Sequence, residues 1–145
     1  MPVQETLPSA PGHGYNEPLT RGDIELMEIS VRRRDGTAIV GVKGRLIREN
    51  QAELRKSLED LVAEGLRGIV LDFQALEYVD SAGLGCCASM RKHLKDRTGG
   101  GLVCFGTSPS IERMWKLIRL DLVIPLFKGE DEAVAWLEKS PASAP

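Results

Sequence analysis

One short stretch of this sequence combines residue types that could do chemistry. It reads Tyr78-Val79-Asp80-Ser81-Ala82-Gly83-Leu84-Gly85, and the pattern around it indicates a junction between a loop and a helix. A serine hydroxyl at the start of a helix can accept hydrogen bonds from backbone N–H groups that the helix leaves unpaired. The same N–H groups, with the positive end of the helix dipole, favour a phosphate. We therefore predict Ser81 as the N-cap of a helix, in surroundings that tolerate a phosphate.

Small residues follow this serine. Ala82, Gly83 and Gly85 leave little side chain, so another protein or a nucleotide could approach the backbone closely. Two interpretations follow from the residues alone. In the first, Ser81 only caps a helix and the glycines only let that helix pack against a sheet. In the second, Asp80 and Ser81 form a displayed polar loop, because two polar groups precede a run of small residues.

Three kinds of enzyme site are excluded by particular residues. The stretch 83–88 fits the dinucleotide pattern G-x-G-x-x-A, but no acidic residue follows about twenty positions later, where residues 105–108 stand. A nucleophile elbow needs G-x-S-x-G, and Val79 occupies the position of its first glycine. A phosphate-binding P-loop needs Gly-Lys-Ser/Thr, which the sequence lacks. We expect no catalytic activity and no cofactor.

Length and composition limit the class of protein further. The chain has 145 residues, 42% of them hydrophobic and 28% charged, and a formal net charge of −2. This length fits one domain, and the near-neutral charge argues against nucleic acid as the main partner. The apolar runs fall far short of the ~20 residues that span a bilayer, so we expect no membrane insertion. The first residues show no secretory signal, so we expect a cytoplasmic protein.

The cysteines indicate structural thiols. Cys86, Cys87 and Cys104 make an odd number, which is not a disulfide framework, and only two histidines accompany them. We therefore expect no metal site and three free thiols that pack as small apolar groups. Cys86 falls in the first turn of the predicted helix, where the dipole could lower its pKa and make it reactive.

Alternating patterns predict a hairpin at the start of the domain. Residues 27–34 alternate apolar and polar side chains, and Asp35-Gly36 offers the positive φ angles of a tight turn. Residues 37–42 return as the second strand, which Gly44 ends. A helix then follows, with Asn50 and Glu53 as a capping box.

The rest of the chain alternates helices and strands. The first helix runs to about Glu64, with Gly65 at its left-handed end, and residues 69–71 form a buried strand. A connection over 74–79 leads to a second helix over 82–97.

A buried strand over 102–105 follows, and Ser108-Pro109 opens a third helix. The apolar stripe of this helix comprises Ile111, Met114, Trp115 and Ile118. A last strand over 123–127 precedes a short helix that opens with three acidic residues at 130–132.

These elements predict an α/β fold. It contains a mixed β-sheet that begins with an antiparallel hairpin, and its helices pack on the sheet. Residues 1–22 are rich in proline and glycine and poor in apolar side chains, which predicts a flexible tail. Residues 140–145 predict a flexible C-terminus, so the domain is expected over 23–139.

The stretch from Val79 to Gly85 resembles the phosphorylation-loop motif of the STAS domain, a module shared by sulfate transporters and bacterial anti-sigma factor antagonists. The resemblance covers about 24–139. Residues 40–46 are similar to the second strand of the family and its turn, and 68–73 to the strand that leads toward the loop. Later parts of the family are matched by 101–106 and 118–127.

The resemblance implies a phosphorylation-controlled partner switch in transcription regulation. In antagonists of this kind, the unmodified domain binds an anti-sigma factor that is also a serine kinase, which frees the sigma factor. Phosphorylation of the hydroxyl residue after the loop aspartate, here Ser81, breaks the complex, and a phosphatase resets it. The residues implied in partner binding are Asp80, Ser81, Ala82, Gly83 and Leu84.

This chain departs from the family pattern at three positions. Arg45 and Ile47 stand where the family often carries acidic residues, and Ala82 replaces a frequent second hydroxyl, which leaves Ser81 as the acceptor in the loop. The resemblance also admits an alternative, a STAS-type regulatory or structural subunit of a membrane transporter or lipid-transport ATPase complex. The intact Asp-Ser-Ala-Gly loop on a separate chain favours the antagonist.

Overall fold

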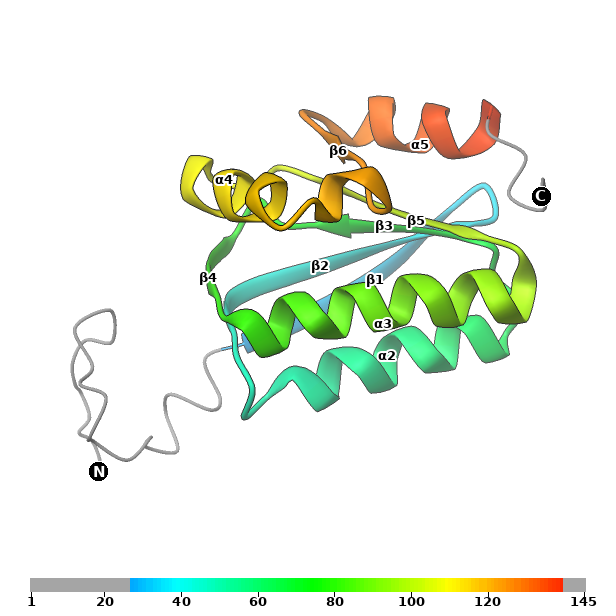
Figure 1. The fold of residues 1–145 in the computed structure, drawn as a ribbon. Helices are drawn as coiled ribbons and strands as arrows, with labels where there is room; N and C mark the ends of the chain where they lie inside the picture. The colour runs from blue at the N-terminus through cyan, green and yellow to red at the C-terminus, as the bar shows by residue number, and fades with distance from the viewer. Residues whose placement is uncertain (1–26, 140–145) are drawn as a thin grey trace.

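The computed structural model describes residues 27–139 and shows a mixed sheet with helices on both faces (Figure 1). The predicted fold class is confirmed. The predicted tails, 1–22 and 140–145, lie outside the described residues, as do residues 23–26 of the expected domain. Within the described range, no helix combines the length and apolar character that crossing a membrane requires.

The sheet begins with the predicted antiparallel hairpin, formed by β1 (Met27–Arg34) and β2 (Thr37–Leu46). Asp35 and Gly36 between them have φ angles of 52° and 85°, as a two-residue turn requires. The prediction that Gly44 ends the second strand is wrong. Gly44 has a φ of 98° and shifts the pairing register, so β2 continues past it and gains a further partner.

Parallel strands complete the sheet in the order β1-β2-β3-β5-β6. They are β3 (Gly68–Asp72), β5 (Gly101–Phe105) and the short β6 (Leu126–Phe127). A further strand, β4 (Leu76–Val79), pairs in parallel with the end of β2, inside the stretch that the sequence pattern assigned to a connection. That prediction is wrong because only the two ends of β4 are buried, which leaves no alternation to detect.

Three helices, α2 (Gln51–Ala63), α3 (Ser81–Thr98) and α4 (Pro109–Leu117), cover one face of the sheet, and α5 (Glu130–Lys139) covers the other. The sheet therefore has a hydrophobic core on each face. Successive residues of a strand contribute to one core and then the other, because side chains alternate between the two faces along a strand. Figure 1 shows α2 and α3 side by side and starting at the same end of the molecule. The carboxyl ends of β2 and β4 and the amino ends of α2 and α3 therefore lie at the same end of the molecule.

The predicted capping box before α2 is wrong. The Asn50 side chain faces backward: its Oδ1 accepts from the N–H of Ile47 at 2.9 Å, and its Nδ2 donates to the carbonyl of Arg45 at 2.9 Å. Asn50 is buried and closes the loop between β2 and α2. The predicted end of α2 is confirmed, because Gly65 has a φ of 89° and its N–H reaches the carbonyl of Val62.

The end of α4 differs from its predicted stripe. Ser108 caps the helix as expected, but Ile118 is 53% exposed. Arg119 takes a left-handed φ of 62°, which stops the helix and turns the chain into the 3-10 helix η2 (Leu120–Leu122). This turn buries Leu120, while Ile118 stays exposed.

The last strand, predicted over 123–127, is shortened to β6. Val123 and Ile124 do not join it, because their N–H groups donate to the carbonyl of Leu120.

Candidate functional site

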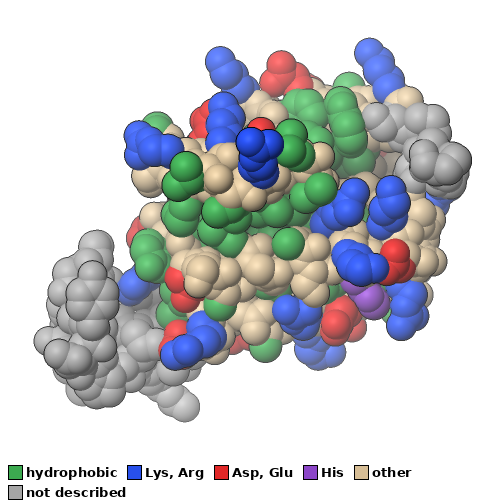
Figure 2. Space-filling model, in the orientation of Figure 1, with side chains coloured by type: hydrophobic (Ala, Val, Ile, Leu, Met, Phe, Trp, Pro, Cys, Tyr) green, Lys and Arg blue, Asp and Glu red, His purple; other side chains and the backbone are tan. Residues whose placement is uncertain are grey.

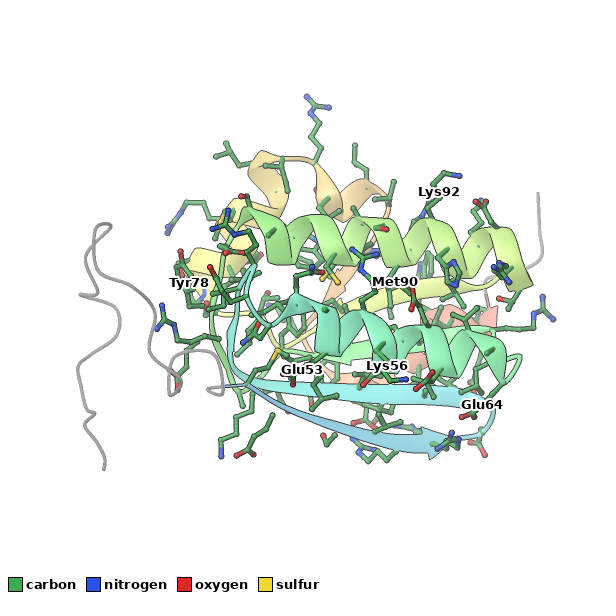
Figure 3. The ribbon with its side chains drawn as sticks, turned by 90° about the horizontal axis from the view of Figure 1, so that it is seen from below. Glu53, Lys56, Glu64, Tyr78, Met90 and Lys92 are labelled. Atoms are coloured by element: carbon green, nitrogen blue, oxygen red, sulfur yellow. The ribbon has the colours of Figure 1, made fainter. Side chains whose placement is uncertain are left out.

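The candidate site lies where β2 and β4 end and α3 begins. Leu46 and Val79 are paired across the last register position of these strands, and both are buried. The N–H of Asp80 donates to the carbonyl of Leu46 at 3.1 Å, which extends the pairing by one step. Figure 3 shows Tyr78 at the end where α2 and α3 begin, and Glu64 at the opposite end of α2.

Asp80, and not Ser81, is the N-cap of α3. The Oδ1 of Asp80 accepts from the N–H of Gly83 at 2.8 Å, and Asp80 has the extended backbone of an N-cap, with φ of −99° and ψ of −179°. Its Oδ2 accepts from the N–H of Arg48 at 2.9 Å. The prediction of Ser81 as the cap is wrong because the pairing of β4 with β2 holds Asp80 extended, and the helix starts one residue later.

Ser81 is therefore the first helical residue, and it is exposed. Within residues 27–139, no group forms a hydrogen bond with its hydroxyl. The helix does not need this hydroxyl for capping, since Asp80 supplies that bond. We call Asp80, Ser81 and Ala82, together with Arg48, the Asp80–Ser81 corner.

Two of the residues implied in partner binding lie beneath this corner. Leu84 is 5% exposed and packs in the core, and Gly83 is buried. A Cβ on Gly83 would lie 2.7 Å from Val79 Cγ2 and 2.9 Å from Leu46 Cγ and from the Leu46 carbonyl oxygen. The accessible residues are the exposed Ser81 and the half-buried Asp80 and Ala82. Gly83 and Leu84 fix α3 against the sheet from within.

Cationic side chains lie within the corner and beside it. The Arg45 guanidinium lies 5.3 Å from the centre of the Tyr78 ring, in cation–π contact, and Tyr78 is itself exposed. Arg48 is exposed and lies 3.5 Å from the Glu49 carboxylate. Ile47 is buried. The sequence pattern pointed to Arg45 only as a departure from the family, and it missed Arg48, because that contact depends on the unpredicted strand β4.

The sequence profile of the STAS domain family matches residues 28–133, which include every residue of this site. The chain belongs to the STAS domain family. The match covers most of the chain, from β1 to the first turn of α5.

Relatives of this STAS domain include an anti-sigma F factor antagonist of Paenibacillus polymyxa, which is 25% identical over 77% of this chain and 96% of its own length. Among solved structures, an anti-sigma factor antagonist from Mycobacterium paratuberculosis is similar, with a TM-score of 0.69 and 27% identity over 78% of this chain and 95% of that one. The murine anion transporter Solute Carrier 26 family member A9 shares the fold alone, with a TM-score of 0.63 and 15% identity over 74% of this chain and 18% of that one.

The cysteines of this STAS domain are free and buried, as predicted. Burial raises the pKa of the Cys86 thiol, although the nearby Arg55 acts in the opposite direction. The sequence left open that the helix dipole lowers the pKa of Cys86; desolvation instead raises it, and the Cys86 thiol donates to the Gln51 carbonyl at 3.7 Å. Burial also raises the pKa of Cys87 and Cys104. No cluster of potential metal ligands occurs among the residues described.

Proposed function

We propose that this STAS domain is an anti-sigma factor antagonist that binds its partner through the Asp80–Ser81 corner. One observation carries the proposal: Asp80 caps α3, so the exposed hydroxyl of Ser81 is not needed to hold the helix. Ser81 is exposed at the start of a helix, beside the small residue Ala82, and its hydroxyl is free to contact another protein. The names of the relatives supply the class of that protein, an anti-sigma factor.

Ser81 is the phosphate acceptor in this proposal. Its Oγ forms a bond to the γ-phosphorus of ATP held by a partner kinase, and the bond between that phosphorus and the ADP oxygen breaks. The hydroxyl proton passes to a base of the kinase. A phosphatase restores the hydroxyl by hydrolysis and releases inorganic phosphate. This chain is the substrate in both steps and contributes the acceptor.

The position of Ser81 makes phosphorylation disruptive for binding but tolerable for folding. A phosphate adds about −1.5 to −2 charges at neutral pH, and the start of a helix accommodates negative charge. The added charge lies beside the Asp80 carboxylate, which already accepts two backbone hydrogen bonds. A partner packed against this corner therefore meets both added volume and an anion next to another anion. The partner we propose is an anti-sigma factor with serine kinase activity that binds the unmodified chain.

Affinity capture from the native host tests this function. The bait is the full chain, with Ser81→Ala and Ser110→Ala as variants. Ser110 is the matched control, because it is an exposed serine in the first turn of another helix, α4. The captured protein is then incubated with ATP, and phosphate on the bait is located by mass spectrometry.

The expected result is capture of a serine kinase that phosphorylates wild type and Ser110→Ala but not Ser81→Ala. Phosphate on any other residue contradicts the assignment of Ser81. Capture of a transporter ATPase in place of a kinase supports the alternative, a STAS subunit of a transport complex.

A further inference from the structure

A second surface stands apart from the corner and is built from apolar residues. Four large hydrophobic side chains that the structure leaves exposed fall between the end of α4 and the residue after η2. They are Leu117 (79% exposed), Ile118 (53%), Leu122 (68%) and Val123 (38%). We call these four residues with Arg113 and Arg119 the α4–η2 surface. Figure 2 shows hydrophobic side chains gathered over α4 and η2. Exposed apolar patches of this kind mark interaction sites.

The backbone beneath this surface is firmly anchored. Trp115 and Ile124 are fully buried, and the Trp115 indole N–H donates to the Ile124 carbonyl at 3.0 Å. The ring of Phe73 meets Trp115 edge to face, with ring centres 5.9 Å apart. Leu120 is buried between the two exposed pairs. The four apolar side chains are therefore displayed by a packed segment and do not result from a frayed helix end.

Arg119 separates the two exposed apolar pairs in an unfavourable backbone conformation. Its φ of 62° lies in the left-handed region, which glycine and asparagine adopt at lower cost than arginine. The other non-glycine residue with positive φ in the described range is Asp35, in a hairpin turn that suits aspartate. A strained residue in a displayed apolar surface points to a use for its side chain. The Arg119 side chain places a positive charge in this surface.

The charge around the apolar residues is mainly positive. Lys116 is paired with Glu112 at 2.8 Å, whereas Arg113 and Arg119 have no ion pair with any residue in the described range. Figure 2 also shows Lys and Arg side chains on the same face, beyond the apolar residues over α3. The second half of α3 carries the basic residues Arg91, Lys95 and Arg97, together with Lys92, which is paired with Asp96 at 2.8 Å. The complement of this surface is apolar at its centre and acidic at its margins.

We propose that the α4–η2 surface docks an amphipathic helix of a protein partner, with an apolar face and acidic margins. A second copy of this chain fits less well, since it would bring the same arginines to the contact. An anionic membrane would offer the same charge, and the vesicle arm of the test distinguishes it from a helix. This proposal involves no chemistry at Ser81 and stands whether or not the proposed function holds.

A synthetic helical peptide with a leucine face and glutamate margins is the probe. The same peptide with lysine margins is its control, and vesicles rich in anionic lipid form a third arm. Binding to the isotope-labelled full chain is followed by NMR chemical shifts and by fluorescence anisotropy at two salt concentrations. We expect the glutamate peptide to shift signals of residues 113–123, with affinity that falls as salt rises.

Three variants locate the contact. Leu117→Ser with Leu122→Ser should weaken binding of the glutamate peptide about tenfold or more, because it removes the two most exposed apolar side chains. Val31→Thr is the matched control, an exposed apolar residue on β1, and should leave binding unchanged. Arg119→Gly should weaken binding while the thermal midpoint does not fall, since glycine relieves the left-handed backbone.

Several results overturn the proposal. They are no binding of the glutamate peptide, equal binding of both peptides, shifts outside the α4–η2 surface, vesicle binding in preference to peptide, or self-association that Leu117→Ser abolishes. Ser81→Asp serves as a separate readout and should leave peptide binding unchanged. Loss of peptide binding in Ser81→Asp would mean that the two surfaces are one site, contrary to this proposal.

Discussion

Asp80 and Arg48 join two loops that are 32 positions apart in the chain: Oδ2 of Asp80 accepts from the backbone N–H of Arg48 at 2.9 Å. Its other carboxylate oxygen caps α3 through Gly83. One side chain thus fixes the turn after β2 and the start of α3. Ser81, the neighbouring residue, is released from capping and stays available at the surface.

Asp80→Ala should therefore destabilise the domain more than Ser81→Ala. Loss of a cap costs about 1 kcal/mol, and the Arg48 N–H loses its acceptor as well, so we expect a total of about 1 to 2 kcal/mol. Ser81→Ala should change the free energy of unfolding by less than about 0.5 kcal/mol. Urea unfolding followed by circular dichroism measures both. A larger loss in Ser81→Ala would contradict the assignment of Asp80 as the cap.

Two glycines in the first turns of α3 should respond to alanine in opposite ways. A Cβ on Gly83 would meet Val79 and Leu46 at 2.7 to 2.9 Å, so overpacking should destabilise Gly83→Ala by about 1 to 3 kcal/mol. A Cβ on Gly85 has nothing within 4 Å, so Gly85→Ala should stabilise the helix by up to about 1 kcal/mol. The midpoints of urea unfolding compare the pair directly. Equal effects would show that Gly83 is less tightly packed than described.

The thiols should react slowly in the folded protein. Burial raises the pKa of Cys86, so little thiolate is present at neutral pH, and Cys87 and Cys104 are buried as well. A chromogenic thiol reagent at pH 7 should label the native protein far more slowly than the urea-unfolded protein. Cys86→Ala is the control for the least deeply buried thiol. Rapid labelling at Cys86 in native buffer would contradict this assignment.

The pH dependence of stability should reveal the contact between the hairpin and α5. Hydrogen bonds from Arg32 and then Arg34 hold the pKa of the Glu130 carboxyl below its ordinary value. A lowered folded-state pKa stabilises the domain above the ordinary carboxyl pKa of about 4.3, and this contribution is lost as pH falls through the lowered value.

Glu130→Gln should therefore cost about 0.5 to 1 kcal/mol at pH 7, because such half-exposed ion pairs are individually weak. The difference from wild type should shrink as pH falls below the carboxyl range. Glu112→Gln, which removes a pair within one helix, is the control and should have a smaller effect. Urea unfolding across acidic pH measures both variants. A Glu130→Gln penalty that is constant with pH would contradict the ion pairs as its cause.

Local signals predicted much of this fold. Asp35-Gly36 specified the hairpin, Gly65 the end of α2 and Ser108 the start of α4, because each requirement is met by one residue type at one backbone position. The strand β4 was not predictable in this way. Its pairing with β2 depends on a register shift at Gly44, which joins segments distant in the sequence.

The junction between loop and helix was predicted at the right place, but its N-cap was not. The sequence pattern identified 78–85 as a junction between a loop and a helix, but two adjacent residues, Asp80 and Ser81, both make good caps, and the sequence alone does not rank them. The end of β4 decides between them by holding Asp80 extended. At the end of α4, the predicted apolar stripe failed at Ile118, because the left-handed backbone of Arg119 ends the helix there. Arginine gives no local sequence signal for that backbone conformation.

Ser81→Ala and Ser81→Asp should separate partner binding from folding. Both variants should fold, because Asp80 keeps its cap and a negative charge is tolerated at a helix start. The alanine leaves the corner small and neutral, so it should bind the partner as wild type does, without accepting phosphate. The aspartate places an anion beside Asp80 at the contact.

The aspartate carries one charge where a phosphate carries nearly two, so it is the weaker mimic. A hundredfold loss of affinity nevertheless needs only ~2.7 kcal/mol. We therefore expect Ser81→Asp to bind the captured anti-sigma factor at least tenfold more weakly than Ser81→Ala, measured by titration calorimetry, with circular dichroism to verify folding. Ser110→Asp is the control for a negative charge in the first turn of an exposed helix and should bind normally. If the two Ser81 variants bind equally, the charge at this corner does not control the complex, and the phosphorylation switch is wrong.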